Sequence, residues 1–194
     1  MKRLLIPPAI LAIFGWLLVL GPGCAFGGVL FLEDFETDLS QWTSGQGVIV
    51  NDPLEADQAL TFTGLNAGGD IWTVASFTSI PGQYILSFDY LGTCGSQGCG
   101  GFVGYDPGDV WLAGTGGWPS LVTLPDTGQW EHITVPFTGP AGISLKVEDW
   151  SGAGGVAGDV YFDNFVLTAV PEPATYALVG LGLCAFALLR RRSA

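Results

Sequence analysis

The sequence predicts an all-β domain built as an antiparallel sandwich or barrel, and three observations support this fold class. Between residues 29 and 168 apolar and polar residues alternate with the period of two that places successive side chains on opposite faces of a strand. Gly, Pro, Asn and Asp interrupt the pattern at nearly every gap, as tight turns require. No segment between these residues carries the 3.6-residue apolar stripe of a helix. Many short strands with this spacing are typical of a single all-β core.

The individual strands follow from the same alternation. The clearest is residues 84–91, in which every second residue is large and apolar. Residues 143–148 alternate likewise, with Lys146 and Glu148 on the polar face. The other predicted strands are, in chain order, residues 29–35, 47–50, 59–64, 71–77, 100–105, 109–114, 120–124, 131–137 and 159–168.

The N-terminus has the composition of a cleaved export signal. Lys2 and Arg3 precede an apolar run from residue 4 to residue 20, and small residues follow it. We therefore expect residues 1–25 to be a signal peptide cleaved after Ala25, and residues 26–169 to be the exported domain.

The charge distribution excludes nucleic acid as a partner. Between residues 25 and 170 there are 17 acidic residues and one basic residue, Lys146, which gives a net formal charge of −16. Such a surface repels phosphates and offers no cations to replace their counterions. Divalent cations are the charged partners that fit, because carboxylate oxygens are their preferred ligands.

Cysteine usage agrees with export to an oxidising compartment. Cys24 lies in the predicted signal and Cys184 in the apolar tail, which leaves only Cys94 and Cys99 for the domain. We expect these two residues to form a local disulfide.

Four motifs of the domain resemble the galactose-binding-like jelly rolls, which include carbohydrate-binding modules and the laminin domain IV type. They are FLEDFETDLSQW, GQYILSFDYLG, TGQWEHITVPF and GDVYFDNFVL. The resemblance implies a jelly roll and a structural calcium ion that joins an acid after the first strand to an aspartate in the last. Glu36 and Asp163 match these two positions, and Asp34, Asp38 and Asn164 could add oxygens. The alternative is that Glu36 and Asp163 are separate acids, each solvated or hydrogen-bonded.

The tryptophans raise the possibility of a sugar-binding surface. Trp118 and Trp150 lie in predicted loops, where their rings can be exposed and can stack on sugars. Trp72 and Trp130 lie in predicted strands and are expected in the core. Because aromatic side chains also supply most of the buried area of a sandwich, a core role is the competing interpretation for each tryptophan.

The sequence does not favour an enzyme. Glu148 and Asp149 are adjacent on a strand and therefore point to opposite faces, so they do not form the facing pair of a glycosidase. No G-x-S-x-G motif is present, and His132 is expected on a strand surface. We expect no catalytic residues and no cofactor other than the structural calcium.

The C-terminus resembles the PEP-CTERM sorting signal of Gram-negative bacteria. Pro171, Glu172 and Pro173 precede an uncharged apolar run, predicted as a helix over about residues 174–189, and Arg190, Arg191 and Arg192 follow it. The resemblance of residues 170–194 implies transient anchoring in the inner membrane, cleavage by an exosortase and delivery to the cell surface or extracellular matrix. A plain C-terminal membrane anchor is the alternative.

Together these features predict an exported, non-catalytic surface protein that binds or organises extracellular polysaccharide. The alternatives are a structural or adhesive surface protein with a protein partner and, third, an extracellular glycosidase.

Overall fold

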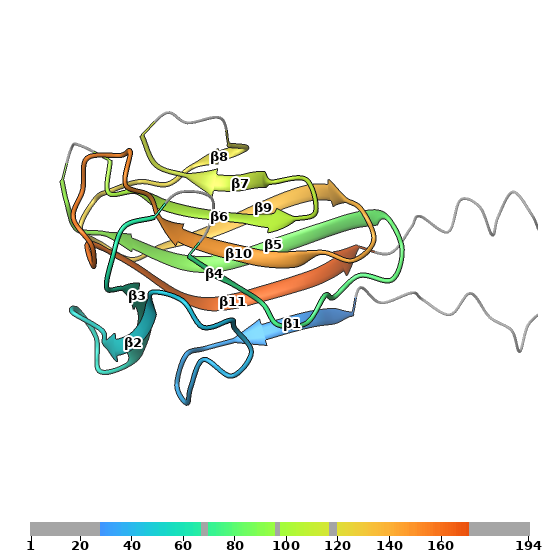
Figure 1. Cartoon of the computed structure of the whole chain (residues 1–194), viewed down its shortest axis with the longest axis horizontal. Helices are drawn as coiled ribbons and strands as arrows, with labels where there is room; N and C mark the ends of the chain where they lie inside the picture. The colour runs from blue at the N-terminus through green and yellow to red at the C-terminus, as the bar shows by residue number, and fades with distance from the viewer. Residues whose placement is uncertain (1–27, 67–69, 96–97, 117–119, 171–194) are drawn as a thin grey trace, which may run out of the picture. The chain divides into compact units, whose positions relative to one another are not determined.

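The computed structural model describes residues 28–66, 70–95, 98–116 and 120–170, and the fold of this part is an all-β sandwich of two sheets (Figure 1). One sheet has the strand order β2–β3–β11–β5–β9, with β1 also paired to β11, and the other has the order β4–β10–β6–β7–β8. The prediction of an all-β sandwich is confirmed. The strands of the first sheet are β1 Val29–Glu33, β2 Gly47–Asn51, β3 Gln58–Phe62, β5 Gly82–Gly92, β9 Glu131–Gly139 and β11 Val160–Val170. The strands of the second are β4 Ile71–Trp72, β6 Gly101–Asp106, β7 Val110–Gly114, β8 Val122–Thr123 and β10 Ser144–Asp149.

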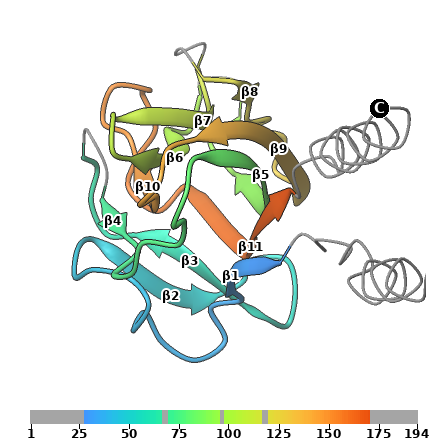
Figure 2. The ribbon, with the colours of Figure 1, turned by 90° about the vertical axis from the view of Figure 1, so that its right-hand side faces the viewer.

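Each predicted strand segment overlaps one of these strands, and the alternation sets which side chains reach the core. In β9 every second residue, Ile133, Val135 and Phe137, is buried, and the residues between them are exposed. The antiparallel register sets Phe137 opposite Tyr84 of β5, whose alternate residues are buried in the same way. The two sheets face each other (Figure 2), and the paired side chains belong to the hydrophobic core.

Two features of the sheets depart from the predicted regular antiparallel pattern. The short strand β8 pairs with β7 in parallel, whereas the other strand pairs within the described ranges are antiparallel. In β11 the register shifts between Asp163 and Val166, and Asn164 has a positive φ of 53°. The extra residue of this bulge lets Phe162 and Phe165 both point into the core although they are three positions apart.

Candidate functional site

The outer face of the five-stranded sheet carries a row of large side chains. Strand register sets Lys146 of β10 beside both Trp72 of β4 and Gly104 of β6, and sets Gly104 beside Trp111 of β7. Their strand neighbours, such as Leu145 of β10, point inward to the core, so this row lies on the opposite, outer face.

Lys146 is covered by its neighbours on this face. Its ammonium nitrogen lies 3.9 Å from the centroid of the Trp111 ring and forms an ion pair with Asp109. The lysine side chain is 0% exposed and that of Asp109 is 71% exposed. A Cβ atom at Gly104 would lie 2.9 Å from Trp111 Cε3, so glycine at this position leaves room for the indole. The polar face of β10 predicted from sequence is therefore buried beneath Trp111.

Trp72 is fixed by hydrogen bonds at the other end of the row. Its Nε1 donates to Asp106 Oδ2 at 2.9 Å, and Asp106 Oδ1 accepts the backbone N–H of Asp109 at 3.1 Å. The ring remains half-buried and does not belong to the core cluster. The expectation that Trp72 lies in the core is wrong, because the parity of β4 directs Ile71 inward and Trp72 outward.

Two further aromatic rings extend the row beyond Trp111. Phe102 packs edge-to-face against Trp111 at 5.5 Å and against Trp150 at 5.6 Å between ring centroids. A side chain at Gly114 would overlap the Phe102 ring, so glycine at this position leaves room for the ring. Trp150 is half-buried, and Trp118, the other predicted binding residue, lies outside the described residues. We call Trp72, Phe102, Trp111 and Trp150 the aromatic face.

The aromatic face has the chemistry of a surface that stacks on neutral ligands. Indole faces contact apolar ring surfaces, and the carboxylates of Asp106 and Asp109 accept hydrogen bonds. Among the described residues Lys146 is the one lysine or arginine, and Asp109 and Trp111 already engage it. An anionic ligand would therefore be repelled by these carboxylates, with no unpaired lysine or arginine among the described residues to bind it.

The predicted calcium ligands lie near one another on the six-stranded sheet. Asp163 is buried, and its Oδ1 and Oδ2 accept hydrogen bonds from the backbone N–H and side-chain amide of Asn164 at 2.7 and 3.1 Å. Burial raises the pKa of Asp163 to about 7, and the negative charges of Asp57, Asp89 and Glu36 also raise it. Glu36 is exposed, and its Oε1 accepts the backbone N–H of Gln58 at 3.1 Å.

This donor set suits a hard cation. Carboxylate oxygens are the ligands that calcium prefers, and a cation would offset the repulsion between the buried Asp163 and the acids around it. The hydrogen bond with Asp57 is the largest cause that raises the pKa of Glu36, so Asp57 is a further acid beside Glu36. Glu36 and Asp163 remain a predicted pair, and Asp57 is a neighbour that the sequence did not single out.

The Cys94–Cys99 disulfide is present, as predicted, with its Cα atoms 5.3 Å apart. Asp126 Oδ2 accepts the backbone N–H of Cys99 at 2.9 Å. Within the described ranges, these two cysteines and Asp126 are the one group of three or more thiol, imidazole or carboxylate ligands close enough to share an ion, but the sulfurs are consumed by the disulfide. His132 instead contacts Asp89, with Nδ1 2.7 Å from Oδ1, on the six-stranded sheet.

Trp130 is a second tryptophan that departs from the expected core position. Its Nε1 donates to Asp52 Oδ2 at 2.8 Å, and its ring is half-buried beside β9. Trp42, by contrast, belongs to the core and donates to Glu33 Oε2 at 3.1 Å. Trp130 is therefore a partly exposed tryptophan that does not belong to the aromatic face.

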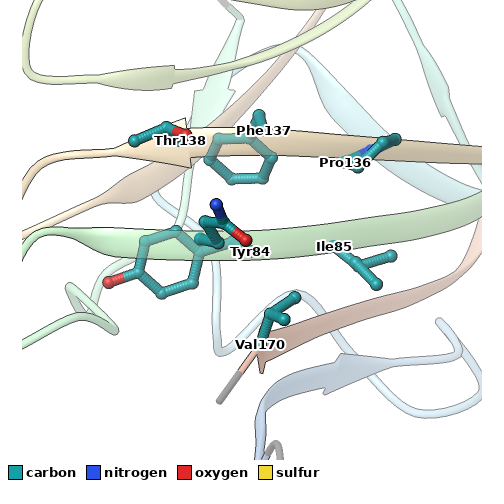
Figure 3. Close-up of a pocket in the computed structure, with 7 residues that line it drawn as sticks. Tyr84, Ile85, Pro136, Phe137, Thr138 and Val170 are labelled. Atoms are coloured by element: carbon teal, nitrogen blue, oxygen red, sulfur yellow. The ribbon is translucent and has the colours of Figure 1, made fainter. Parts of the chain in front are cut away.

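A surface pocket of about 530 Å³ lies on the six-stranded sheet (Figure 3). Tyr84 and Phe137 form its aromatic wall, and Ile85 and Val170 lie beside them. The Tyr84 hydroxyl donates to the Ile80 carbonyl at 2.6 Å, so it is already engaged. The pocket offers few polar groups to orient a ligand, which favours the aromatic face as the candidate site.

Comparison with known proteins identifies the C-terminal segment and the fold. Residues 169–192 match the PEP-CTERM protein-sorting motif, so the chain carries this motif, which indicates export and sorting to the cell surface. No curated protein is similar to the chain at a significant level. The predicted tail helix lies outside the described residues, and the part that the structure describes contains no helix long and apolar enough to cross a membrane.

Several solved structures similar to this chain are, or contain, carbohydrate-binding modules. The CBM22-1 and GH10 modules of the Clostridium thermocellum xylanase Xyn10B, complexed with xylohexaose, align with a TM-score of 0.51 at 14% identity, over 76% of this chain and 30% of that one. The CBM22-1 xylan-binding domain of Paenibacillus barcinonensis Xyn10C aligns with a TM-score of 0.49 at 16% identity, over 76% and 97%. The domain thus has the jelly-roll fold of carbohydrate-binding modules.

Proposed function

We propose that this protein is exported, sorted to the cell surface and bound there to neutral polysaccharide through the aromatic face. The observation that carries this proposal is the row of Trp72, Trp111 and Trp150 on the outer side of one sheet, next to carboxylates that accept hydrogen bonds. The fold of the carbohydrate-binding modules supports it, and a similar module is described as xylan-binding. A β-linked neutral polysaccharide such as xylan is therefore the first ligand to test.

Glu36 and Asp163 are proposed to hold a structural calcium ion, with Asp57 as a neighbouring acid. The ion would supply positive charge between an acid that follows β1 and the last strand, and would so stabilise the six-stranded sheet. It takes no part in chemistry on the ligand.

Loss of either central tryptophan should weaken polysaccharide binding. Trp72→Ala and Trp111→Ala are each expected to raise the dissociation constant roughly thirtyfold, because truncating a central aromatic side chain costs about 2 kcal/mol. Affinity electrophoresis of the purified protein in gels containing xylan measures the change.

Trp130→Ala is the matched control for these variants, because it removes a half-buried, hydrogen-bonded tryptophan elsewhere on the domain. It should leave the retardation unchanged. Equal retardation of the wild type, Trp72→Ala and Trp111→Ala would refute the assignment of the aromatic face.

The sorting signal is proposed to be cleaved by an exosortase near Pro171, Glu172 and Pro173 after transient anchoring of the tail in the inner membrane. Mass spectrometry of the surface-delivered protein should find a C-terminus close to these residues. Recovery of the intact Arg190–Arg191–Arg192 end on surface protein would instead indicate a permanent anchor.

A further inference from the structure

Three buried aspartates meet where strand β10 ends and the loop to β11 begins. Asp149 ends β10, Asp159 immediately precedes β11, and Asp70 immediately precedes β4. Their exposed fractions are 0%, 6% and 4%, respectively. Buried carboxylates of this kind are normally paired with a cation or fully hydrogen-bonded.

Each of the three aspartates uses only one of its two carboxylate oxygens. Oδ2 of Asp149 accepts the backbone N–H of Gly158 at 3.1 Å, and Oδ2 of Asp159 accepts that of Val156 at 2.8 Å. Oδ2 of Asp70 accepts the backbone N–H of Asp149 at 2.8 Å. The Oδ1 atom of each aspartate is buried and has no hydrogen-bond partner.

The charged surroundings of these carboxylates are all negative. Burial, together with the negative charges of Asp159, Asp70 and Glu148, raises the pKa of Asp149 to about 7. Asp126 lies near Asp159 and raises its pKa as well, and the Tyr90 hydroxyl is bound to Asp126. The one described lysine, Lys146, is paired with Asp109.

Two glycines let main-chain carbonyl groups lie close to these carboxylates, where a side chain would collide with them. A Cβ atom at Gly100 would lie 3.0 Å from Asp149 Oδ1 and 2.8 Å from the Trp150 carbonyl oxygen. A Cβ atom at Gly155 would lie 2.5 Å from Asp159 Oδ2 and 2.6 Å from the Cys99 carbonyl oxygen. Because the Cys99 carbonyl belongs to the peptide that joins it to Gly100, the two close approaches are neighbours. A side chain at either position would push these oxygens apart.

We propose that Asp149 and Asp159, together with the main-chain carbonyls of Cys99 and Trp150, bind a calcium ion. Two carboxylates, two carbonyls and added water supply the six to eight hard oxygen ligands that calcium takes. This site is separate from the Glu36–Asp163 pair and uses none of its residues. The ion would fasten the loop that begins with Trp150, and so hold one end of the aromatic face in place.

The test removes the first predicted calcium site and asks whether a second remains. The full-length protein carrying Glu36→Gln and Asp163→Asn is stripped with chelator and titrated with calcium by calorimetry at a pH of about 8, where Asp149 is ionised. We expect one ion to bind and the melting temperature to rise. No binding at millimolar calcium, the weak end for extracellular sites, would overturn the proposal.

Variants of the proposed ligands give the second arm of the test. In the same background, Asp149→Asn and Asp159→Asn should each abolish the bound ion, whereas Asp126→Asn, whose oxygens already accept hydrogen bonds from Tyr90 and Cys99, should keep it. Gly155→Ala, whose methyl group would lie 2.5 Å from Asp159 Oδ2 and 2.6 Å from the Cys99 carbonyl oxygen, should displace these oxygens and so also abolish it, which provides the answer if an aspartate variant does not fold. Retention of the ion by Gly155→Ala together with either folded aspartate variant would refute the site. These readouts count ions, so they stand apart from polysaccharide binding.

Discussion

Replacing Phe165 by alanine is expected to lower the free energy of unfolding by about 3–5 kcal/mol, the range found for large aromatic truncations in cores. Phe165 is fully buried, and its ring stacks on Phe88 with centroids 5.1 Å apart. It also meets Phe35 at 6.0 Å and Trp42 at 5.8 Å, so it joins the segment after β1 to the last strand. Urea unfolding followed by tryptophan fluorescence measures the change.

Leu32→Ala is the control for the Phe165 variant. Leu32 lies on β1 opposite Val166, the residue next to Phe165, but its side chain is exposed. Its truncation should change the unfolding free energy by less than about 0.5 kcal/mol. A Phe165→Ala protein as stable as Leu32→Ala would show that the bulge in β11 does not direct Phe165 into the core.

Stability of the calcium-free protein should fall as the pH rises from about 4 to above 7, by an amount on the order of a few kcal/mol. Burial raises the pKa of Asp149 and of Asp163 to about 7, above the ordinary value of 3.8. The folded state therefore favours their protonated forms. The stabilisation from these two protonated carboxyl groups is fully present below their pKa in the unfolded chain. It is lost as the pH rises through their pKa in the folded protein. Hydrogen bonds lower the pKa of Asp38 and Asp57, but both are exposed, so their opposing effect is small.

Thermal melts in chelator across this pH range test the prediction. Asp149→Asn should flatten the pH dependence, because it removes one of the two carboxyl groups whose pKa is raised to about 7. Added calcium should reverse the trend above pH about 7, because the ion binds the deprotonated carboxylates. A chelated protein that gains stability between pH about 5 and 8 would contradict the account.

The strands were predictable because their signal is local. In β5 and β9 one face is buried and the other is not, so the alternation of each segment alone identifies it. The parallel pairing of β8 with β7 carries no such signal, since the two residues of β8 are too few to show a period.

The candidate site was only partly predictable, for a related physical reason. Trp72 and Trp111 were missed because large apolar residues occur on both faces of the five-stranded sheet, and only the parity of the paired strands shows which face is outer. Placing their strand neighbours Ile71 and Leu112 in the core would have shown that Trp72 and Trp111 face outward. Trp150 lies outside the named strands, directly after β10, as predicted, but its packing on Phe102 of β6 joins residues distant in sequence.

The buried carboxylates depend even more on tertiary structure. Asp149 was recognised as pointing away from Glu148 by strand alternation, but the sequence did not show that both side chains are buried. Its approach to Asp159 and to Gly100 is produced by the folding of the loop between β10 and β11 and by a segment that follows the disulfide. The spacing of these residues in the sequence does not predict that Asp149 lies close to Asp159 and Gly100.

The most direct test of the aromatic face is the indole N–H spectrum of the protein during titration with a neutral xylo-oligosaccharide. The account predicts saturable shifts for Trp72, Trp111 and Trp150, with no change for Trp42 in the core or for Trp130 beside Asp52. Xylan binding with unchanged Trp72 and Trp111 signals, or with shifts confined to Trp130, would contradict it.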